Sequence, residues 1–474
     1  MGARNVIDLW NLNSLLPQVV FTLAVLALVL ISTHHIITNT VLSVLHSHGI
    51  SSTFTYATHA GVNPSPFAHL ASHCASVPPI TTTEFLARQD SLARILHEQG
   101  ATAYVAEAGP DAFFFANISQ ASWHLSERPF LLIVTPDIVT SASADATVRA
   151  RVTLLTPEFE ETRARTLPVP ARELHYAAWP EDGNPYTAAL GVLRHAQDDD
   201  ANKATILVDG NMRMFVADGL RHAAGEGAQV APATPEVTAL RERKSPAEIA
   251  LLRCANEATL LAVRAARERM RIGMRESEAR ALVESALAAA GLREGFALTL
   301  FGENAALPHG SGTDRVLGAE DFVLVDTGGT LHGYSSDVTR TFALPDSTIP
   351  QAHIDLWHTV HTAQSIALAT AHEGQATGRV DAAARAWLEY KGYARYFTHR
   401  LGHGIGIETH ESPYLVGGST DTLRAGHVFS DEPGVYIEGR VGVRLEDCFF
   451  VSERGYAVYL TEGVGGQAGD PWSP

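Results

Sequence analysis

The sequence predicts an α+β protein in which a duplicated C-terminal domain follows a smaller α/β domain and an N-terminal hydrophobic segment. Three observations predict this organisation. Residues 15–37 are almost continuously apolar. Short apolar runs alternate with helix-like stretches over residues 81–240, and one order of elements, two helices followed by a hairpin, occurs twice within residues 241–474. We therefore expect three parts: residues 1–80, 81–240 and 241–474.

The length, net charge and cysteine content of the chain indicate how many domains it has and which partners and cross-links to expect. A chain of 474 residues can bury the cores of two or three domains. Its 52 acidic and 35 basic residues give a net charge of −17, which disfavours a nucleic acid as the main partner. The three cysteines, Cys74, Cys254 and Cys448, are too few and too widely spaced for a disulfide framework, so we expect packed or free thiols.

The N-terminal segment has the composition of a membrane-associated sequence. Between Asp8 and Glu84 the chain has no Asp, Glu, Lys or Arg. Within it, the apolar run of residues 15–37 is close to the length that crosses a bilayer. We expect a single-pass anchor with a cytosolic N-terminus, because Arg4 precedes the run. A cleaved secretory signal and a buried core helix are the alternatives.

The expected orientation of the N-terminal segment also predicts the location of the rest of the chain. If the segment spans a membrane or is a secretory signal, the rest of the chain is lumenal or extracellular. The triplet "NIS" at Asn117 is then a possible glycosylation acceptor.

The middle part reads as a compact α/β domain. The runs "TAYVAEA", "FLLIVTP" and "TILVDG" have the length and apolar character of strands, and "EFLARQDSLARILHEQG" has the pattern of a helix. No glycine fingerprint follows any of these strands, so nucleotide binding is not expected here.

A long helix begins the C-terminal part. Ser245, Pro246 and Glu248 occupy the N-cap, N1 and N3 positions of a capping box, and Gly273 lies beyond the end of the helix. A second helix ends at Gly291, and β-branched residues then predict a hairpin over residues 322–344.

The same order recurs about a hundred residues later. A helix runs to Gly374, a shorter one runs to Gly392, and a second hairpin covers residues 427–451. A pseudo-twofold arrangement of the two copies would bring the hairpins face to face.

Each hairpin carries two carboxylates on mostly apolar strands: Asp326 and Asp337 in the first, Glu432 and Glu446 in the second. Residues paired across a hairpin have Cβ atoms roughly 5 Å apart, so two acids in one hairpin can point at one spot. Four converging, buried carboxylates repel one another unless cations neutralise them. The arrangement therefore predicts a pair of metal ions.

The glycine-rich segment "LGHGIGIETHE", residues 401–411, adds a histidine to the four oxygen donors, and no cysteine takes part. This donor set suits hard or borderline divalent ions such as Mn²⁺ better than a structural zinc. Two such ions can deprotonate a bridging water near neutral pH. We therefore expect metal-assisted hydrolysis by a metal-bridging hydroxide.

Several motifs together resemble one family: "NAALPHG", "VDTGG", "SDVTRTF", "GHGIGIETHE", "DEPGVY" and "VRLEDC". They look like the pita-bread metallopeptidases, the family of prolidase, aminopeptidase P and methionine aminopeptidase. The resemblance covers residues 245–465, and the domain before it resembles the creatinase-type N-terminal domain of the proline-specific members. It implies the following metal ligands: Asp326, Asp337, His403, Glu432 and Glu446.

The resemblance also implies roles at the site. His309 and His410 would contact the substrate, and His410 would help to stabilise the tetrahedral oxyanion. Glu432 would carry the proton from the attacking hydroxide to the leaving nitrogen. Arg444 could clamp a substrate carboxylate, with a role as charge partner of the acid cluster as the alternative.

The function implied is cleavage of the Xaa-Pro bond of small peptides with two divalent metal ions. We expect these ions to be Mn²⁺, and Co²⁺, Fe²⁺ and Zn²⁺ are the alternatives. We expect a dipeptidase, because "HRLGHGIGIETHE" looks closest to prolidases. An aminopeptidase P acting on longer peptides is the alternative, and an inactive binding module of the same fold is a remote one. A homodimer is expected from the resemblance alone.

Overall fold

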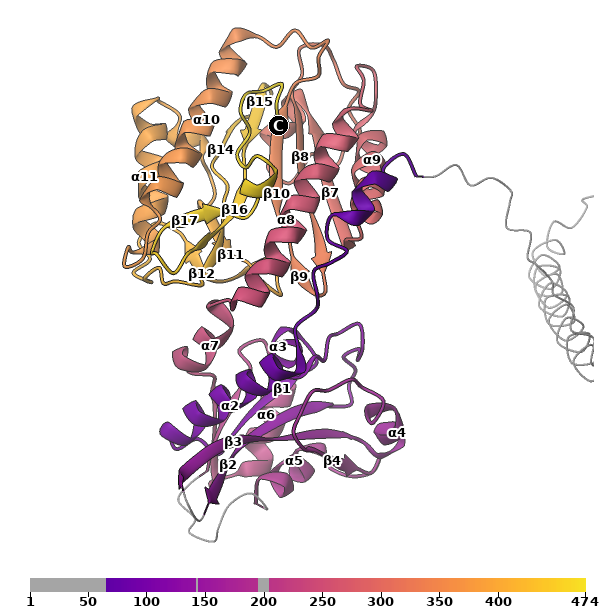
Figure 1. The fold of residues 1–474 in the computed structure, drawn as a ribbon, viewed down its shortest axis with the longest axis vertical. Coiled ribbons are helices and arrows are strands. Elements are labelled where there is room, and N and C mark those ends of the chain that lie inside the picture. Colours follow the sequence, from indigo (N-terminus) through magenta and orange to yellow (C-terminus); the bar gives the residue numbers. More distant parts are fainter. Residues whose placement is uncertain (1–64, 142–143, 195–203) are drawn as a thin grey trace, which may run out of the picture. The chain divides into compact units, whose positions relative to one another are not determined.

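The computed structural model describes residues 65–141, 144–194 and 204–474 (Figure 1). Before the first long helix, the chain from Ser65 forms a short turn of helix, η1 (Ala68–Ser72), which contacts the C-terminal part of the protein through α8 and α9. The predicted bounds at 80/81 and 240/241 remain predictions.

A six-stranded sheet forms the first large element, with the strand order β4-β3-β2-β1-β5-β6. Its strands are β1 (Ala103–Glu107), β2 (Leu131–Ser141), β3 (Ala144–Pro157), β4 (Leu174–Trp179), β5 (Ala204–Val208) and β6 (Ala228–Pro232). The central strand β1 is buried at every residue, and it pairs antiparallel with β2 and parallel with β5. The strands predicted from "TAYVAEA", "FLLIVTP" and "TILVDG" are thus found, as β1, β2 and β5.

Helices accompany this sheet. They are α2 (Thr82–Glu98), α3 (Pro110–Ala116), α4 (Glu161–Ala164), α5 (Pro185–Arg194) and α6 (Met214–Ala224), followed by α7 (Pro235–Glu242). The helix α2 begins where Thr81 accepts a hydrogen bond from the Glu84 backbone N–H, which satisfies one of the free donors of its first turn. It contacts β2 and β3 along the sheet.

The predicted capping box begins the helix α8 (Pro246–Arg267). The Ser245 hydroxyl accepts from the Glu248 N–H, and the Glu248 carboxylate accepts from the Ser245 N–H. Glu248 is almost fully buried and has two further partners, Arg88 of α2 at 3.3 Å and the Tyr334 hydroxyl at 3.0 Å. One carboxylate therefore caps α8 and also binds it to α2.

The first half of the C-terminal part continues with α9 (Glu276–Ala289), β7 (Arg293–Phe301), β8 (Val323–Leu331), β9 (Tyr334–Ser335) and β10 (Val338–Phe342). The strand β8 pairs antiparallel with both β7 and β10, as the predicted hairpin requires. The helix α8 packs along β8 (Figure 1).

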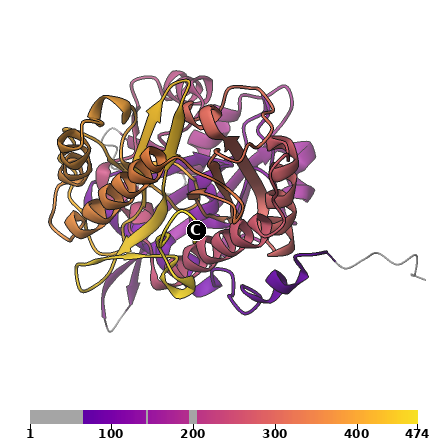
Figure 2. The same cartoon turned by 90° about the horizontal axis from the view of Figure 1, so that it is seen from above.

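The second half repeats the order of elements. It contains α10 (Gln351–Thr370), α11 (Thr377–Tyr390), β11 (Gly402–Gly404), β12 (Glu411–Leu415), β13 (Val428–Asp431), β14 (Gly434–Ile437), β15 (Val441–Arg444), β16 (Asp447–Val451) and β17 (Ala457–Tyr459). The predicted hairpin is present as β13 and β16, with the smaller hairpin β14–β15 between them. In the view of Figure 2, α8 and α9 lie on one side and α10 and α11 on the other, with strands between them. The pseudo-twofold relation itself remains a prediction.

An isolated β-bridge joins the two halves at Thr339 of β10 and Glu446. The Glu446 N–H donates to the Thr339 carbonyl at 3.0 Å. This bridge brings the carboxylate-bearing ends of the two hairpins together.

The prediction that all three cysteines are packed or free thiols was wrong for two of them. Cys74 and Cys254 form a disulfide with 5.8 Å between their Cα atoms, and the buried Cys448 is a free thiol. Spacing could not reveal the pair, because the two residues are 180 apart in the sequence and only η1 packing on α8 brings them together.

The predicted transmembrane anchor finds no support and is corrected. Among the residues that the structure describes, no helix is long and apolar enough to cross a membrane. The longest, α8, carries charged residues such as Arg253, Glu257 and Arg264. The segment 15–37, on which the prediction rested, lies outside the described residues. The membrane-anchored, lumenal or extracellular location inferred from it is therefore not retained.

Candidate metal centre

The four predicted carboxylates stand at strand ends or on a central strand. Asp326 lies within β8 and pairs across the hairpin with Thr339, while Asp337 directly precedes β10. Glu432 follows the last residue of β13, and Glu446 precedes the first residue of β16. The pairing of β13 with β16 thus sets the two glutamates side by side at one end of the hairpin.

The structure brings these side chains together with His403. Ligand atoms of Asp326, Asp337 and Glu446 lie within 4.8 Å of one another, and so do those of His403, Glu432 and Glu446. The two sets share Glu446. The arrangement therefore offers two adjoining positions for cations, one built from carboxylate oxygens alone and the other from carboxylate oxygens and the His403 imidazole.

Two of the carboxylates have oxygens that no protein donor satisfies. Oδ1 of Asp337 and Oε1 of Glu446 are buried, and neither has a hydrogen-bond partner among the residues that the structure describes. A buried, unsatisfied carboxylate oxygen is costly, and coordination by a cation would remove that cost. The oxygen-rich donor set also fits hard or borderline divalent metal ions. The residues present therefore fit a metal pair.

The cluster perturbs the pKa values of its own members. Burial, followed by repulsion from Asp326 and Glu432, raises the pKa of Asp337 well above its ordinary value. Burial and the neighbouring Asp337 do the same to Glu446. Burial raises the pKa of Glu432 to about 7, although Arg444 opposes that shift. Without cations, the site would thus retain protons that metal binding has to displace.

His403 is held in its neutral form. Its ring is 2% exposed, and burial lowers its pKa to about 3. The Nδ1–H donates to the Gly404 carbonyl at 3.1 Å, which leaves the Nε2 lone pair 3.3 Å from Oε1 of Glu432. A backbone acceptor on one ring nitrogen fixes the tautomer that presents the other nitrogen to a metal.

The glycines beside His403 are required by close backbone packing. A Cβ at Gly402 would stand 2.0 Å from the carbonyl oxygen of Ser430, and one at Gly404 would stand 2.5 Å from that of Glu411. No other residue fits between the neighbouring strands at these two positions. The glycine-rich segment therefore begins with a packed strand, β11, that aims His403 at the carboxylates.

The two predicted substrate histidines lie at the rim. His410 is exposed, and its ring meets the His403 ring edge to face at a centroid distance of 4.1 Å. One of its nitrogens lies within 4.8 Å of ligand atoms of Asp337 and His403. His309 is exposed, and it lies close enough to contribute to the lowered pKa values of both His399 and His410. These positions suit contact with a substrate above the carboxylates.

Arg444 adopts the alternative arrangement, as a charge partner of the acid cluster. Its Nη2 lies 2.6 Å from Oδ2 of Asp326, and its Nε donates to the Thr339 hydroxyl at 3.1 Å. It is 3% exposed. The Thr339 hydroxyl in turn donates to Oε2 of Glu446 at 2.6 Å, so one arginine orients carboxylates of both halves.

Sequence reasoning missed three residues near the centre. The hydroxyl of the buried Tyr436 donates to Nε2 of His399 at 2.7 Å, because Nδ1 of that ring donates to the Arg400 carbonyl, and it accepts a hydrogen bond from Arg444 at 3.0 Å. Burial lowers the pKa of His399 to about 4. Arg400 lies close enough to affect the pKa values of three site residues: His403, His410 and Glu432. All three stand within motifs quoted from the sequence, His399 and Arg400 in "HRLGHGIGIETHE" and Tyr436 at the end of "DEPGVY", but no role was assigned to them there.

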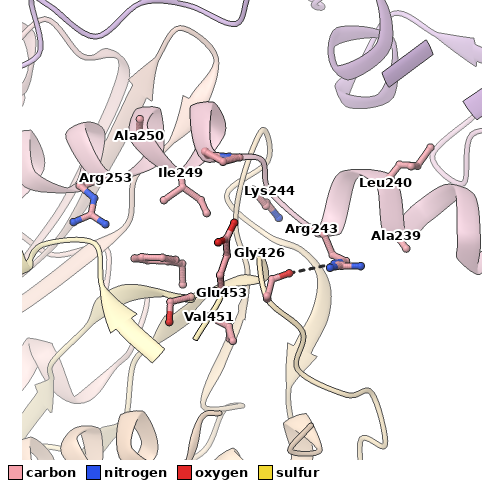
Figure 3. Close-up of a pocket in the computed structure, with 14 residues that line it drawn as sticks. Ala239, Leu240, Arg243, Lys244, Ile249, Ala250, Arg253, Gly426, Val451 and Glu453 are labelled. Carbon is pink, nitrogen blue, oxygen red and sulfur yellow. Dashed lines mark hydrogen bonds between the residues drawn. The ribbon is translucent and has the colours of Figure 1, made fainter. Parts of the chain in front are cut away.

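The cavities help to locate the site. A cavity of about 640 Å³ between α7, α8 and residues 450–453 contains none of the predicted site residues, and its arginines Arg243 and Arg253 lie along its wall (Figure 3). A smaller cavity of about 250 Å³ is lined by His410 and Tyr414 together with Asp111, Asp209 and Arg241. The second cavity adjoins the metal centre through His410.

Comparisons with known proteins agree with this geometry. Residues 250–453 match the model of metallopeptidase family M24. An uncharacterized peptidase of Schizosaccharomyces pombe is 36% identical over 377 residues, which cover 78% of this chain and 80% of the relative. Among solved structures, dipeptidase PepE from Mycobacterium ulcerans has a TM-score of 0.70 at 29% identity, over 81% of this chain and 97% of that one. A prolidase from Thermococcus sibiricus has a TM-score of 0.67 at 25% identity, over 81% and 98%.

The structural matches confirm the mixed α/β, pita-bread architecture of the described residues. The relative from Schizosaccharomyces pombe extends the similarity beyond the family model, over most of both chains. Together with the cluster of carboxylates and His403 between the two hairpins, these similarities show that the chain belongs to metallopeptidase family M24.

Proposed function

We propose that the protein hydrolyses the Xaa-Pro peptide bond of dipeptides with two divalent metal ions, for which Mn²⁺ is our first candidate. The observation that carries the proposal is the pair of buried carboxylate oxygens without a partner, on Asp337 and Glu446, inside a cluster of four carboxylates and one imidazole. The similarity to a solved dipeptidase and a solved prolidase supports the substrate class.

The residues that would hold the metals are Asp326, Asp337, His403, Glu432 and Glu446. When bound, divalent cations would supply Lewis acidity and lower the pKa of a coordinated water. Arg444 and Thr339 would keep the carboxylates of both hairpins oriented for that binding.

Glu432 is suited to move the proton. Burial raises its pKa to about 7, which suits proton exchange near neutral pH, and the Ser430 hydroxyl donates to its Oε1 at 3.2 Å. It would accept a proton as water attacks the carbonyl carbon and pass that proton to the proline nitrogen as the C–N bond breaks. The products are a free amino acid and proline.

His410 is suited to stabilise the oxyanion. Burial lowers its pKa, so the ring is neutral at pH 7 and still carries one N–H donor. A donor aimed at the carbonyl oxygen strengthens its hydrogen bond as negative charge develops there. His309, on the same rim, would line the proline side.

The test is a substrate series on purified protein with measured metal content. Ala-Pro should be hydrolysed in the presence of Mn²⁺, and chelation should abolish the activity until metal is restored. Efficient cleavage of Ala-Pro-Ala with no cleavage of Ala-Pro would instead favour the aminopeptidase P alternative. Absence of hydrolysis of either peptide at full metal occupancy would refute the proposal. The homodimer expected from the resemblance remains a prediction.

A further inference from the structure

The disulfide joins the segment before α2 to the C-terminal part of the protein, away from the metal centre. Cys74 follows η1, and Cys254 stands on α8. On the same helix Asn256, two positions further on and so on the other face, accepts a hydrogen bond from the Asp337 N–H at 3.3 Å. The two cysteines and the carboxylate cluster therefore lie on opposite faces of α8.

A histidine beside the disulfide completes a set of metal-ligand types. One ring nitrogen of His73 and the sulfur atoms of Cys74 and Cys254 all lie within 4.8 Å of one another. Both cysteines are buried, whereas His73 is partly exposed, so an ion in solution reaches the group from the side of the histidine. Two thiolates and one imidazole are a known ligand set for zinc, with a water molecule in the fourth position.

Glu257 holds the histidine in the form that binds a metal. The Nε2–H of His73 donates to Oε2 of Glu257 at 2.9 Å, which leaves the lone pair of the neutral ring on Nδ1. Glu257 stands three residues after Cys254 on α8, and its side chain is 13% exposed. A carboxylate on the second ring nitrogen is the usual partner of a metal-bound histidine. This contact does not involve the cysteines, and it independently indicates a metal ligand at His73.

The sulfur atoms bind a metal only as thiolates, so such a site belongs to the reduced protein. The Cα atoms of the two cysteines are 5.8 Å apart, which lets both thiolates reach one Zn²⁺ at roughly 2.3 Å through rotation of their side chains. Dithiols and glutathione keep thiols reduced in cytosolic compartments, where a disulfide seldom persists. An ion held by the same two side chains would there replace the covalent bond.

We propose that Cys74, Cys254 and His73 bind one Zn²⁺ when the disulfide is reduced, and that Glu257 orients His73 for this binding. A dithiol reduces the S–S bond with two electrons and two protons, which gives two thiols, and the dithiol itself becomes a disulfide. Zn²⁺ then displaces the two thiol protons into solvent. The chain at η1 is thus held on α8 in both redox states. This site is separate from the proposed peptidase function and does not depend on it.

The test uses the full chain, reduced with a phosphine and titrated with Co²⁺ as a spectroscopic substitute for Zn²⁺. Thiolates bound to Co²⁺ give a strong near-ultraviolet charge-transfer absorption, which the carboxylate and imidazole ligands of the metal centre do not give. The reduced wild type should show this absorption, and the disulfide form should not. In solutions of buffered free Zn²⁺ the absorption should disappear, because thiolates favour zinc.

Three variants identify the ligands and their partner. Cys254→Ser should lose the absorption. Cys448→Ala is the matched control and should keep it, because Cys448 is the free thiol and lies beside the Asp337 carbonyl instead. Glu257→Gln should bind Zn²⁺ about 10- to 100-fold more weakly in the reduced form, while the melting temperature of its disulfide form stays unchanged. A purely structural role of Glu257 would give the reverse result.

A zinc count on the wild type alone covers the case in which a variant does not fold. After dialysis against the same buffered Zn²⁺, the reduced protein should contain one more zinc ion per chain than its disulfide form. Equal zinc contents of the two forms overturn the proposal. So does a reduced wild type without the thiolate–cobalt absorption, or an absorption that Cys254→Ser retains.

Discussion

The hydroxyl of Thr339 donates a hydrogen bond to Oε2 of Glu446 across the junction of the two halves, with 2.6 Å between the oxygens. Thr339→Val should remove this bond while keeping the shape of the side chain. Partners that orient a metal ligand typically contribute a factor of about 10 to 100 to metal affinity. Calorimetric titration of the metal-free protein with Mn²⁺ would measure that loss, and Thr339→Ser should restore most of the affinity. Equal affinities for all three proteins would contradict this role.

Asp337→Asn should abolish metal binding and hydrolysis together, because it removes a ligand with a buried, unsatisfied oxygen. The metal-free variant should also unfold at a higher temperature than the metal-free wild type above neutral pH, since one of several repelling buried carboxylates has become neutral. Thermal scans with and without Mn²⁺ test both points. Retained hydrolysis would rule out the proposed ligand set.

The metal-free protein should lose stability as the pH rises from about 6.5 to about 8. Asp337 and Glu446 have raised pKa values, and that of Glu432 is about 7, so the folded state holds protons that the unfolded chain has released. Such groups contribute stability that is complete below their unfolded pKa values and is lost as the pH rises through the folded ones.

The buried histidines change the stability of the fold with pH in the opposite direction, but they do so at lower pH. Burial lowers the pKa of His403 to about 3 and that of His399 to about 4, so their contribution is lost as the pH falls below about 6.5, where unfolded imidazoles take up protons. Above that pH the carboxylates determine whether stability rises or falls with pH, and they make it fall. The increase in melting temperature on adding Mn²⁺ should therefore grow between about pH 6.5 and about pH 8, and a constant increase would contradict the assignment.

The disulfide should stabilise the fold independently of the metal centre. Cys74 and Cys254 close a loop with a sequence separation of 180, for which loop-closure entropy gives an upper value of about 5 kcal/mol. Cys74→Ser should lower the melting temperature, and a reducing agent should lower that of the wild type equally without affecting the variant. A variant as stable as the oxidised wild type would show that the bond contributes nothing.

A buried ion pair behind the centre offers a last test. Arg340 and Asp447 are both fully buried, and Arg340 also donates to the Glu446 carbonyl at 2.6 Å. Asp447→Asn would leave Arg340 without its anion, at a cost of roughly 3 to 5 kcal/mol. Chemical denaturation would measure the loss of unfolding free energy. A change below about 1 kcal/mol would show that the arginine finds another partner.

The local signals in the sequence predicted much of the fold. The capping box at Ser245 fixed the start of α8 to the residue, since cap chemistry is local. The β-branched residues predicted a hairpin over residues 322–344, which is present as the pairing of β8 with β10. The hairpin of residues 427–451 was predicted as one unit, and the extra hairpin β14–β15 inside it was missed because its short strands have no separate periodicity.

The contacts at the site were predicted less well, because they depend on residues far apart in the chain. Sequence could name Asp326 and Arg444 but could not show that they pair, 118 residues apart. It could not find Tyr436, whose position opposite His399 exists only after the second half has folded. The disulfide was missed for the same reason. The motifs identified which residues belong to the site. The hydrogen-bond and ion-pair partners of those residues could be identified only from the tertiary structure.

The shared role of Glu248, which caps α8 and pairs with Arg88 of α2, bears on how this enzyme can be divided or recombined. A fragment that begins after α7 would retain a buried anion and lose its cation, so the peptidase half expressed alone should be prone to misfolding. Exchange of the N-terminal half with that of a relative would succeed only if the donor supplies an arginine in the position of Arg88.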